Sequence, residues 1–393
     1  MKRILLHLGF ALIFVINVYG QSGQDENVSW NIVDSTLTLT GTGAMKDYDL
    51  NNNKAPWYPH RGLIKNVVIE TGLTTIGQSA FAMCPILANI EITDSVTIIG
   101  DNAFLVCRNL VGINIPDSTK TIGALAFGAC SALTGINLPK GVETIGEGAF
   151  SGCSKLNTIN VDNNNSAFKD INGIVFSKDD EELLIYPAGK EDSLYIVPDH
   201  VTTIGYGAFL NCENLARIEV QDGVTTIGRE AFYNCQKLKI VKIPGSVISI
   251  GNNTFHYCNS LDTIEVDWAT PVSVNSGIFT ASSIANATLS VPEGTKSAYE
   301  AANVWRDFGS IVERITTGNN PIFLGKVNAS YTNGVLTINS PCAEIVKVYN
   351  IAGTLICTIE KAEGKLTYPF SNLPNGIYIA TGNNGWSVKV LKK

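Results

Sequence analysis

The chain has 393 residues, of which 45% are hydrophobic and only 16% are charged. This composition predicts a folded chain with a large apolar core and excludes intrinsic disorder. The formal net charge of −7 and the lack of a Lys/Arg cluster exclude nucleic acid as an expected partner, because phosphate binding needs grouped basic side chains.

The segment 1–20 has the pattern of an export signal. Lys2 and Arg3 precede an apolar run over 4–18, and the small residue Gly20 follows at a suitable cleavage position. The run is shorter than the ~20 apolar residues that span a bilayer, and no later stretch is long enough. We expect a signal peptide over 1–20, a mature chain that starts near Gln21 outside the cytoplasm, and no membrane span in that mature chain.

Residues 21–62 predict an N-terminal cap for the array that follows. The stretch "VSWNIVDSTLTLTGTG" alternates apolar and polar residues, as the strands of a hairpin do. Trp57 and Tyr58 supply large side chains that would cover the first unit of the array.

An internal repeat fills residues 63–266. Its Ile-Gly pairs recur at one constant interval, with a single longer interval before the fifth pair; their glycines are Gly77, Gly100, Gly123, Gly146, Gly205, Gly228 and Gly251. The unit reads L-x-x-I-x-I-P-x-x-V-x-x-I-G-x-x-A-F-x-x-C. This pattern predicts a strand, a second extended piece, a glycine that permits a tight bend, and a short helical turn. Because one unit buries too few side chains to fold alone, we expect the units to stack as coils of a solenoid.

Each unit carries a Phe and a Cys at the same short spacing. No unit offers a second Cys or a His at the spacing of a zinc site, so we expect no metal. Cysteines stacked in register point the same way and lie farther apart than a disulfide favours. We therefore interpret these residues as small buried hydrophobes in an internal structural ladder. The ladder comprises Phe81, Cys84, Phe104, Cys107, Phe127, Cys130, Phe150, Cys153, Phe209, Cys212, Phe232, Cys235, Phe255 and Cys258.

The long interval between Gly146 and Gly205 contains one repeat and an insertion, which we place at about 163–198. The segment "INGIVFSKDDEELLIYPAG" has two apolar runs around a charged turn. That pattern predicts a hairpin that projects from the array.

One residue in each predicted strand lies between two inward aliphatic residues and so points outward. This outward row comprises Glu91, Asn114, Asn137, Asn160, Glu219, Lys242 and Glu265. Two interpretations stay open. The asparagines could bond along the row while the last three residues alternate in sign across adjacent strands, or a partner could bind the row. Amphipathic aromatic residues near the bends, Tyr206, Tyr233 and Tyr257, are further binding candidates, with core packing as the alternative.

Two further regions follow the array. Residues 267–315 predict a C-terminal cap with a strand, a turn, a short helix and a closing strand, and "TTGNNP" over 316–321 is a linker by composition. Evenly spaced short strands over 322–393 predict a small Ig-like β-sandwich. Cys342 and Cys357 lie in it, and the sequence leaves open whether they form a disulfide.

The repeated "IG..AF..C..L" resembles the BspA-like leucine-rich repeats of surface proteins from Gram-negative anaerobes, over about residues 30–315. The blocks "NGVLTI", "VKVYNIAGTLI", "LPNGIYIA" and "KVLKK" resemble the C-terminal sorting domain of type IX secretion. The resemblance implies a leucine-rich repeat solenoid and export by outer-membrane machinery that reads the tail. It also implies a secreted or surface-attached protein that adheres to host extracellular matrix or mucosal proteins, or to other bacterial cells.

Catalysis has little support in the sequence. There is no G-x-S-x-G, H-E-x-x-H or P-loop motif, and outside the signal the three histidines His60, His200 and His256 lie far apart. We expect no catalytic residue, no cofactor and no enzyme activity, and we hypothesise a binding or adhesion platform. The alternatives are a carbohydrate-binding module, or a surface glycan-processing enzyme with two carboxylates ~5–10 Å apart in a cleft at the insertion.

Overall fold

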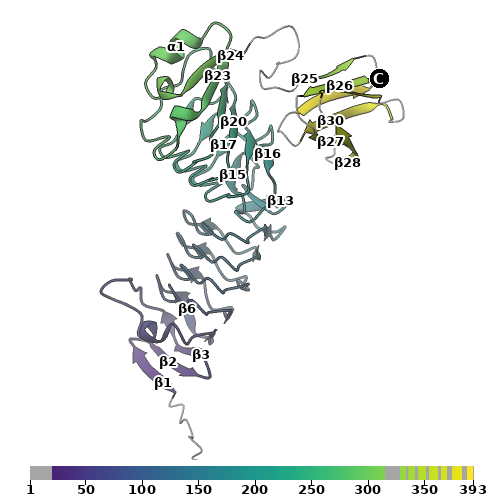
Figure 1. The fold of residues 1–393 in the computed structure, drawn as a ribbon. Coiled ribbons are helices and arrows are strands. Elements are labelled where there is room, and N and C mark those ends of the chain that lie inside the picture. The colour runs from purple at the N-terminus through teal and green to yellow at the C-terminus, as the bar shows by residue number, and fades with distance from the viewer. Residues whose placement is uncertain are drawn as a thin grey trace, which may run out of the picture. The chain divides into compact units, whose positions relative to one another are not determined.

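The computed structural model describes residues 20–314 and, beyond them, the segments 328–332, 335–340, 344–350, 354–361, 364–369, 374–382 and 387–392. The predicted signal peptide up to residue 19, the linker over 316–321 and Cys342 lie outside the described residues. Within residues 20–314, short strands form the coils of a mainly-β solenoid, as predicted (Figure 1). Among them, no helix is long and apolar enough to cross a bilayer.

The chain divides into two compact units. The first runs to Glu191 and includes Thr203–Glu213 and Glu230–Asn234, whereas the second contains Asp192–Thr202, Asn214–Arg229 and the residues from Cys235 onward. This division differs from the predicted caps and array, whose boundaries stay predictions.

Short strands make up nearly all of the regular structure in the first unit. They are β1 (Gln21–Asp25), β2 (Val28–Val33), β3 (Thr36–Gly41), β4 (Gly43–Ala44), β5 (Asn66–Ile69), β6 (Leu73–Ile76), β7 (Asn89–Glu91), β8 (Ile98–Ile99), β9 (Thr121–Ile122), β10 (Gly135–Leu138), β11 (Thr144–Ile145), β12 (Thr158–Val161), β13 (Phe168–Ile171), β14 (Ile174–Ser177), β15 (Glu182–Ile185) and β17 (Thr203–Ile204), with the 3-10 turn η1 (Tyr58–His60).

The sheets of the first unit begin antiparallel and continue parallel. Strands β1, β2 and β3 form an antiparallel meander, and β3 then pairs in parallel with β5, and β5 with β7. A second sheet has the order β11-β9-β8-β6-β4, and β10 pairs in parallel with β12. The register joins residues one repeat apart, such as Ile122 and Ile145, so sequence repeats become neighbours in space.

One parallel sheet dominates the second unit, with the order β16-β18-β20-β22-β23-β24. The elements are β16 (Leu194–Ile196), β18 (Arg217–Glu219), β19 (Thr226–Ile227), β20 (Ile240–Ile243), β21 (Ser249–Ile250), β22 (Thr263–Val266), η2 (Ile284–Asn286), β23 (Thr288–Pro292), α1 (Lys296–Ala301), η3 (Trp305–Asp307) and β24 (Ser310–Arg314). Strand β19 pairs in parallel with β21. Between β23 and β24 lies α1, in the strand–helix–strand order that the sequence predicts for this region.

The tail of the chain also consists of strands. These are β25 (Asn328–Thr332), β26 (Val335–Ser340), β27 (Glu344–Asn350), β28 (Leu355–Lys361), β29 (Gly364–Pro369), β30 (Gly376–Gly382) and β31 (Ser387–Lys392). They form two antiparallel sheets with the orders β25-β26-β29 and β28-β27-β30-β31. Packing of these sheets into an Ig-like sandwich stays a prediction, and Cys357 is a half-buried thiol.

A column of aromatic rings runs through the interior of the first unit. Ring centres of successive members lie 5.3–5.9 Å apart in the order Trp57, Phe81, Phe104, Phe127 and Phe150. Offset stacking at this spacing adds to the energy of apolar burial in every coil. The column therefore fixes the same spacing inside the array that the strand register fixes at its faces.

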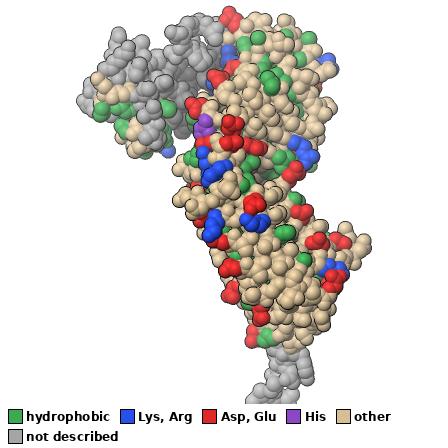
Figure 2. Space-filling model, turned by 180° about the vertical axis from the view of Figure 1, so that it is seen from behind, with side chains coloured by type: hydrophobic (Ala, Val, Ile, Leu, Met, Phe, Trp, Pro, Cys, Tyr) green, Lys and Arg blue, Asp and Glu red, His purple; other side chains and the backbone are tan. Residues whose placement is uncertain are grey.

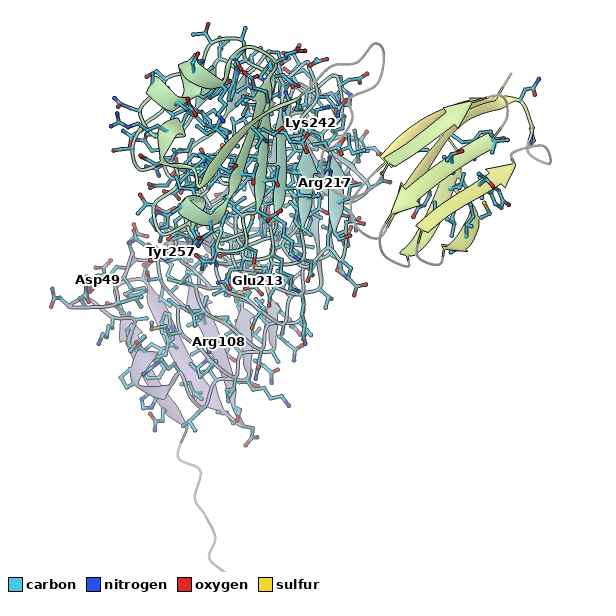
Figure 3. The ribbon with its side chains drawn as sticks, turned by 45° about the horizontal axis from the view of Figure 1, so that its top comes forward. Asp49, Arg108, Glu213, Arg217, Lys242 and Tyr257 are labelled. Carbon is cyan, nitrogen blue, oxygen red and sulfur yellow. The ribbon has the colours of Figure 1, made fainter. Side chains whose placement is uncertain are left out.

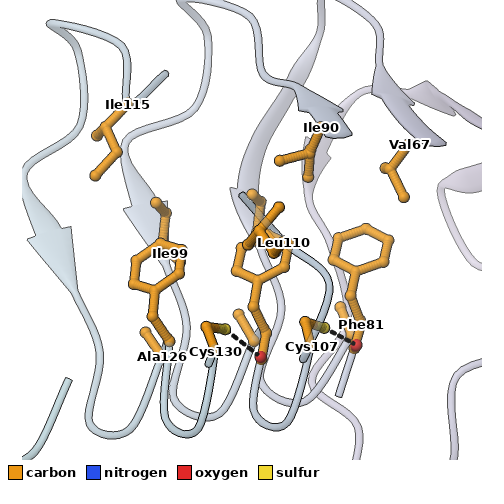
Figure 4. Close-up of a cluster of buried hydrophobic side chains, with 14 of the residues drawn as sticks. Val67, Phe81, Ile90, Ile99, Cys107, Leu110, Ile115, Ala126 and Cys130 are labelled. Atoms are coloured by element: carbon orange, nitrogen blue, oxygen red, sulfur yellow. Dashed lines mark hydrogen bonds between the residues drawn. The ribbon is translucent and has the colours of Figure 1, made fainter. Parts of the chain in front are cut away.

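The cysteines lie beside the rings (Figure 4). The thiol of Cys107 donates a hydrogen bond to the carbonyl oxygen of Phe81 at 3.1 Å, and Cys130 and Cys153 repeat this bond to the preceding coil at 3.2 and 3.1 Å. All members of the predicted ladder are at most 5% exposed. A small side chain with a weak donor thus fills this position and satisfies a buried carbonyl group.

Close packing, and not a left-handed backbone, explains the Ile-Gly glycines. A Cβ atom at Gly146 would lie 2.3 Å from the backbone nitrogen of Ala124, and one at Gly251 would lie 2.3 Å from that of Arg229. Neither glycine has positive φ. The N–H of Gly146 donates to the carbonyl of Ile122 at 2.7 Å. At Gly146 and Gly251 the predicted bend is therefore wrong in its cause: glycine is needed there because adjacent coils touch backbone to backbone.

The left-handed residues lie elsewhere in each coil, two after the glycine and one before the cysteine. They are Ser79, Met83, Asn102, Val106, Leu125, Ala129, Gly148, Gly152, Gly207, Asn211, Glu230, Asn234, Asn253 and Tyr257. This conformation turns the N–H along the array: that of Val106 donates to Gly128 at 2.7 Å and that of Leu125 to Glu147 at 3.0 Å. The corner is thus a pair of hydrogen-bonded turns and not the predicted short helical turn, and the bonds offset backbone strain.

The hairpin predicted within 163–198 is present as β14 and β15, but it forms part of an enlarged coil of the array. Strand β14 does pair with β13 and β15 in antiparallel hairpins, but β15 then joins β17 in parallel. Tyr186 occupies the ring position, since its ring stacks on Phe209 at 4.9 Å and its N–H donates to Ala208 at 2.7 Å. Cys212 donates to the carbonyl of Tyr186 at 3.7 Å, as other cysteines do to Phe. The array therefore continues through the insertion.

We predict that Gly146→Ala destabilises the protein by roughly 3 kcal/mol, because its Cβ overlaps the backbone of the preceding coil and neither backbone has room to move. Urea unfolding of the full chain measures this loss. The matched control is Gly112→Ala, where nothing lies within 4 Å of the added Cβ and the unfolding free energy should stay within ~0.5 kcal/mol. Equal losses in the two variants would contradict the close-packing explanation.

We also predict that the ladder thiols resist alkylation in the folded protein and make it sensitive to alkali. Burial raises the pKa of Cys84, Cys130 and Cys258 to about 12, whereas an unfolded thiol titrates near ~8.5. The stabilising contribution is complete below the unfolded pKa and is lost as pH rises towards the folded one. The unfolding free energy should therefore fall as the pH rises from 9 to 12. In Cys130→Ala, which has one ladder thiol fewer, the fall per pH unit should be about 1.4 kcal/mol smaller than in the natural chain. Rapid labelling of the native protein by iodoacetamide at pH 8 would contradict this expectation.

Candidate binding surface

The outward row of the first unit is accessible. Glu91 lies in β7, Asn137 in β10 and Asn160 in β12, whereas Asn114 lies in the irregular segment 111–116. All four side chains are exposed. The amide of Asn160 donates to the side-chain oxygen of Asn137 at 2.9 Å, but the structure gives Asn114 no side-chain hydrogen bond within the described chain. The predicted ladder of three asparagines is therefore reduced to one bonded pair, and Asn114 keeps its full hydrogen-bonding capacity.

A second asparagine pair lies at the start of two strands in the same unit. The side-chain nitrogen of Asn89 donates to the side-chain oxygen of Asn66 at 2.9 Å, across β7 and β5. The sequence predictions missed this pair, although the two asparagines are one repeat apart, the interval that marks neighbours throughout the array. Its position on the same strand as Glu91 extends the amide-rich part of the surface.

Two ion pairs join charged side chains across coils of the first unit. Lys120 pairs with Glu143 at 2.6 Å and Lys140 with Asp117 at 2.8 Å, and each pair joins corresponding positions of successive repeats. On the face drawn in Figure 2, acidic and basic side chains are interspersed among uncharged ones. The face drawn in Figure 2 therefore shows charges of both signs side by side, and not a patch of one sign that would attract a polyelectrolyte.

The row in the second unit is less accessible than predicted. Glu219, Lys242 and Glu265 do occupy one register line across β18, β20 and β22. Glu265 is only 4% exposed, so its assignment to an accessible surface is wrong. Lys242, labelled with Arg217 in Figure 3, forms no ion pair with either carboxylate in the described chain. Arg217 pairs with both instead, with its Nε 2.8 Å from Glu219 and an Nη 3.8 Å from Glu265.

Arg217 lies two positions before Glu219, so both side chains lie on the same face of the strand. This spacing is visible in the sequence, but the predicted row did not include Arg217. Burial raises the pKa of Glu265, against the opposing effect of Arg217, Arg314 and Lys242. A buried charge held by a neighbouring guanidinium is a structural pair that keeps its partners in place. This part of the row therefore contributes to the fold more than to a binding surface.

The three candidate tyrosines have different environments. Tyr206 is half-buried, and its hydroxyl donates to Glu230 at 2.8 Å. Tyr233 is also half-buried, whereas Tyr257 is 43% exposed and meets the ring of His256 edge-on at 4.3 Å. Of the three, Tyr257 offers the most surface to a ligand. Within the described chain no group of His, Cys, Asp and Glu is placed to hold a metal ion.

Comparison with protein families agrees with this architecture. The model of the BspA-type leucine-rich repeat region matches residues 58–179 and 193–302 in six copies, and that of a secretion-system C-terminal sorting domain matches residues 332–393. A search of curated proteins gave no significant match.

Solved structures of bacterial repeat proteins are similar. A leucine-rich repeat protein from Eubacterium ventriosum shares 29% identity over 68% of this chain and 76% of its own, with a TM-score of 0.56. A leucine-rich cell surface protein from Faecalibacterium prausnitzii has 20% identity, 75% and 95% coverage and a TM-score of 0.52. The pneumococcal vaccine antigen PcpA has 18% identity, 75% and 99% coverage and a TM-score of 0.50. The last two show the fold alone. The family matches confirm the resemblance seen in the sequence: the chain belongs to the BspA-type leucine-rich repeat family and carries a type IX sorting domain.

Proposed function

We propose that this secreted or cell-surface repeat protein is a binding platform for proteins of the host extracellular matrix or mucosa, or of other cells. The observation that carries the proposal is the exposed outward row of the first unit, Glu91, Asn114, Asn137 and Asn160. The apolar ladder residues of this array are turned inward, whereas the row is an exposed surface that the scaffold can present to a partner.

The chemistry of the row favours a protein partner over a charged polymer. Each asparagine amide provides two donors and one acceptor group, which suits the backbone and polar side chains of a protein. Asn137 and Asn160 lie on paired strands, about 4.8 Å apart, and their amides are bonded to each other, so little side-chain order has to be created at these two residues on binding. The sorting domain implies delivery to the outside of the cell by the secretion machinery, where such partners are found.

We predict that Asn137→Arg in the full chain weakens binding to a captured matrix or mucosal protein at least tenfold, because a long charged side chain displaces the amide contacts in the middle of the row. Surface plasmon resonance against a panel of matrix proteins and mucins measures the change. The matched control, Asn52→Arg, makes the same substitution in an exposed loop and should bind normally. If Asn137→Arg binds as tightly as the control, the row is not the binding surface.

A glycan array on the Asn137→Arg variant and on Tyr257→Ala tests the alternative of glycan binding. Tyr257 is the exposed aromatic side chain among the three candidates, and aromatic faces stack on sugars. A glycan-array signal that disappears in Tyr257→Ala and persists in Asn137→Arg would replace the protein-binding proposal with a carbohydrate-binding one.

We predict that deletion of residues 332–393 leaves the protein inside the outer membrane, because the sorting domain is the part that the secretion machinery recognises. Immunoblots of medium, surface and periplasmic fractions from the producing bacterium measure its location. Equal export of the full chain and the truncated chain would contradict a sorting role for this segment.

A further inference from the structure

The enlarged coil leaves a gap in the regular corner of the array. In an ordinary coil five steps along the chain separate the strand residue Ile204 from the ring residue Phe209. In the enlarged coil only three steps separate Leu183, the register partner of Ile204, from Tyr186. The omitted positions are those of the Ile-Gly corner. At this corner the coil before the enlarged coil contacts the coil after it directly.

One hydrogen bond marks this meeting. The side-chain nitrogen of Asn211 donates to the hydroxyl oxygen of Ser151 at 2.9 Å, although the two residues are 60 positions apart in the chain. At this level the ring column is interrupted: Phe150 stacks on Phe127, and no ring stacks on its other face in the described chain. The missing corner therefore leaves space where the regular repeat would have placed backbone and a ring.

A cavity of about 170 Å³ fills this space. Its lining includes the aromatic side chains of Phe150, Phe168, Tyr186 and Tyr206, with Leu184 among the aliphatic ones. Glu147, which is exposed, and the half-buried corner residues Gly148 and Leu210 also line it, so the cavity opens to solvent on that side. An apolar cavity of ~150 Å³ is large enough for benzene.

The lining contains one half-buried carboxylate, that of Glu182. Glu182 is partly buried, and among the described residues its side chain forms no ion pair and accepts no hydrogen bond. Burial, followed by the neighbouring Asp179, raises the pKa of this carboxyl group. A desolvated carboxylate of this kind gains from a cation that a ligand supplies.

Aromatic rings around the carboxylate favour the same kind of ligand. The negative face of an aromatic ring attracts ammonium groups, most strongly where water is excluded. The ring of Tyr186 already has the ammonium of Lys190 at 6.0 Å from its centre, and that ammonium donates to the backbone oxygen of Asn172 at 3.2 Å. Lys190 does not line the cavity, so the space beside Glu182 is left for another cation.

We propose that the cavity binds a small organic ammonium ion, whose apolar body occupies the aromatic space and whose charge pairs with Glu182. The site is separate from the outward row and does not depend on the function proposed for that row. The cavity exists because this coil lacks the Ile-Gly corner of the repeat. The coils that contain Gly77, Gly100, Gly123, Gly146, Gly205, Gly228 and Gly251 keep that corner.

The test uses three probes of similar size and different charge on the full chain: benzylammonium, benzyl alcohol and benzoate. NMR titration of ¹⁵N-labelled protein should give benzylammonium an affinity at least tenfold higher than benzyl alcohol, with no binding of benzoate. The perturbed amides should include Gly146, Gly148 and Gly207, which line the cavity. Equal affinities for the ammonium and the alcohol, or perturbations confined to other residues, would overturn the proposal.

Matched variants locate the charge. Glu182→Gln should lower the affinity for benzylammonium at least fivefold and leave that for benzyl alcohol unchanged. Glu181→Gln removes the same charge from the adjacent, exposed position outside the cavity lining and should change neither. Unchanged ammonium binding in Glu182→Gln would refute the assignment. If that variant does not fold, the comparison of the three probes on the natural chain still decides.

Discussion

Successive coils approach one another so closely that the backbone of one lies against the backbone of the next at the Ile-Gly corners. This contact leaves no room for a Cβ atom, as at Gly146, and it sets the distance between coils. The rings of Phe104 and Phe127 stack 5.3 Å apart at that same distance, and the backbone N–H groups of the corners find carbonyl partners one coil away. One spacing between coils therefore allows strand pairing, hydrogen bonding at the corners and ring stacking at the same time, and this combination stabilises the array.

The same constraint explains what remains for function. Inward positions are taken up by packing, so we propose binding only at the outward row and at the coil where the repeat is interrupted. In the first unit the row is rich in amides. In the second unit Glu265 of the row is buried in an ion pair with Arg217 and is not accessible to a partner. At the enlarged coil the repeat omits its corner, and a cavity replaces the ring contact that Phe150 would have had; its half-buried carboxylate, that of Glu182, has no ion-pair partner among the described residues. The regular coils thus produce the outward row, and the enlarged coil produces the cavity.

Periodicity in the sequence was sufficient to predict the solenoid, because equivalent residues of successive repeats can become neighbours only when the coils stack. It also predicted which side chains point inward. It did not reveal why glycine follows isoleucine, since closeness between coils is a property of the stack and not of one unit. Nor did it reveal that Val106 and Leu125 adopt left-handed backbone, which propensity disfavours and inter-coil hydrogen bonds support. Tyr186 was missed as a ring residue because the two omitted positions shift the motif out of its pattern.

Amide hydrogen exchange of the full chain tests the central claim most directly, because it measures how firmly each coil is bonded to the next. The N–H groups of Phe104 and Phe127 donate to the following coil at 2.7 and 2.8 Å, whereas the segment 111–116 has no strand pairing. The account predicts that these two amides exchange among the slowest in the chain and that segment 111–116 exchanges at least a hundredfold faster. Rapid exchange at Phe104 and Phe127 under native conditions would contradict it.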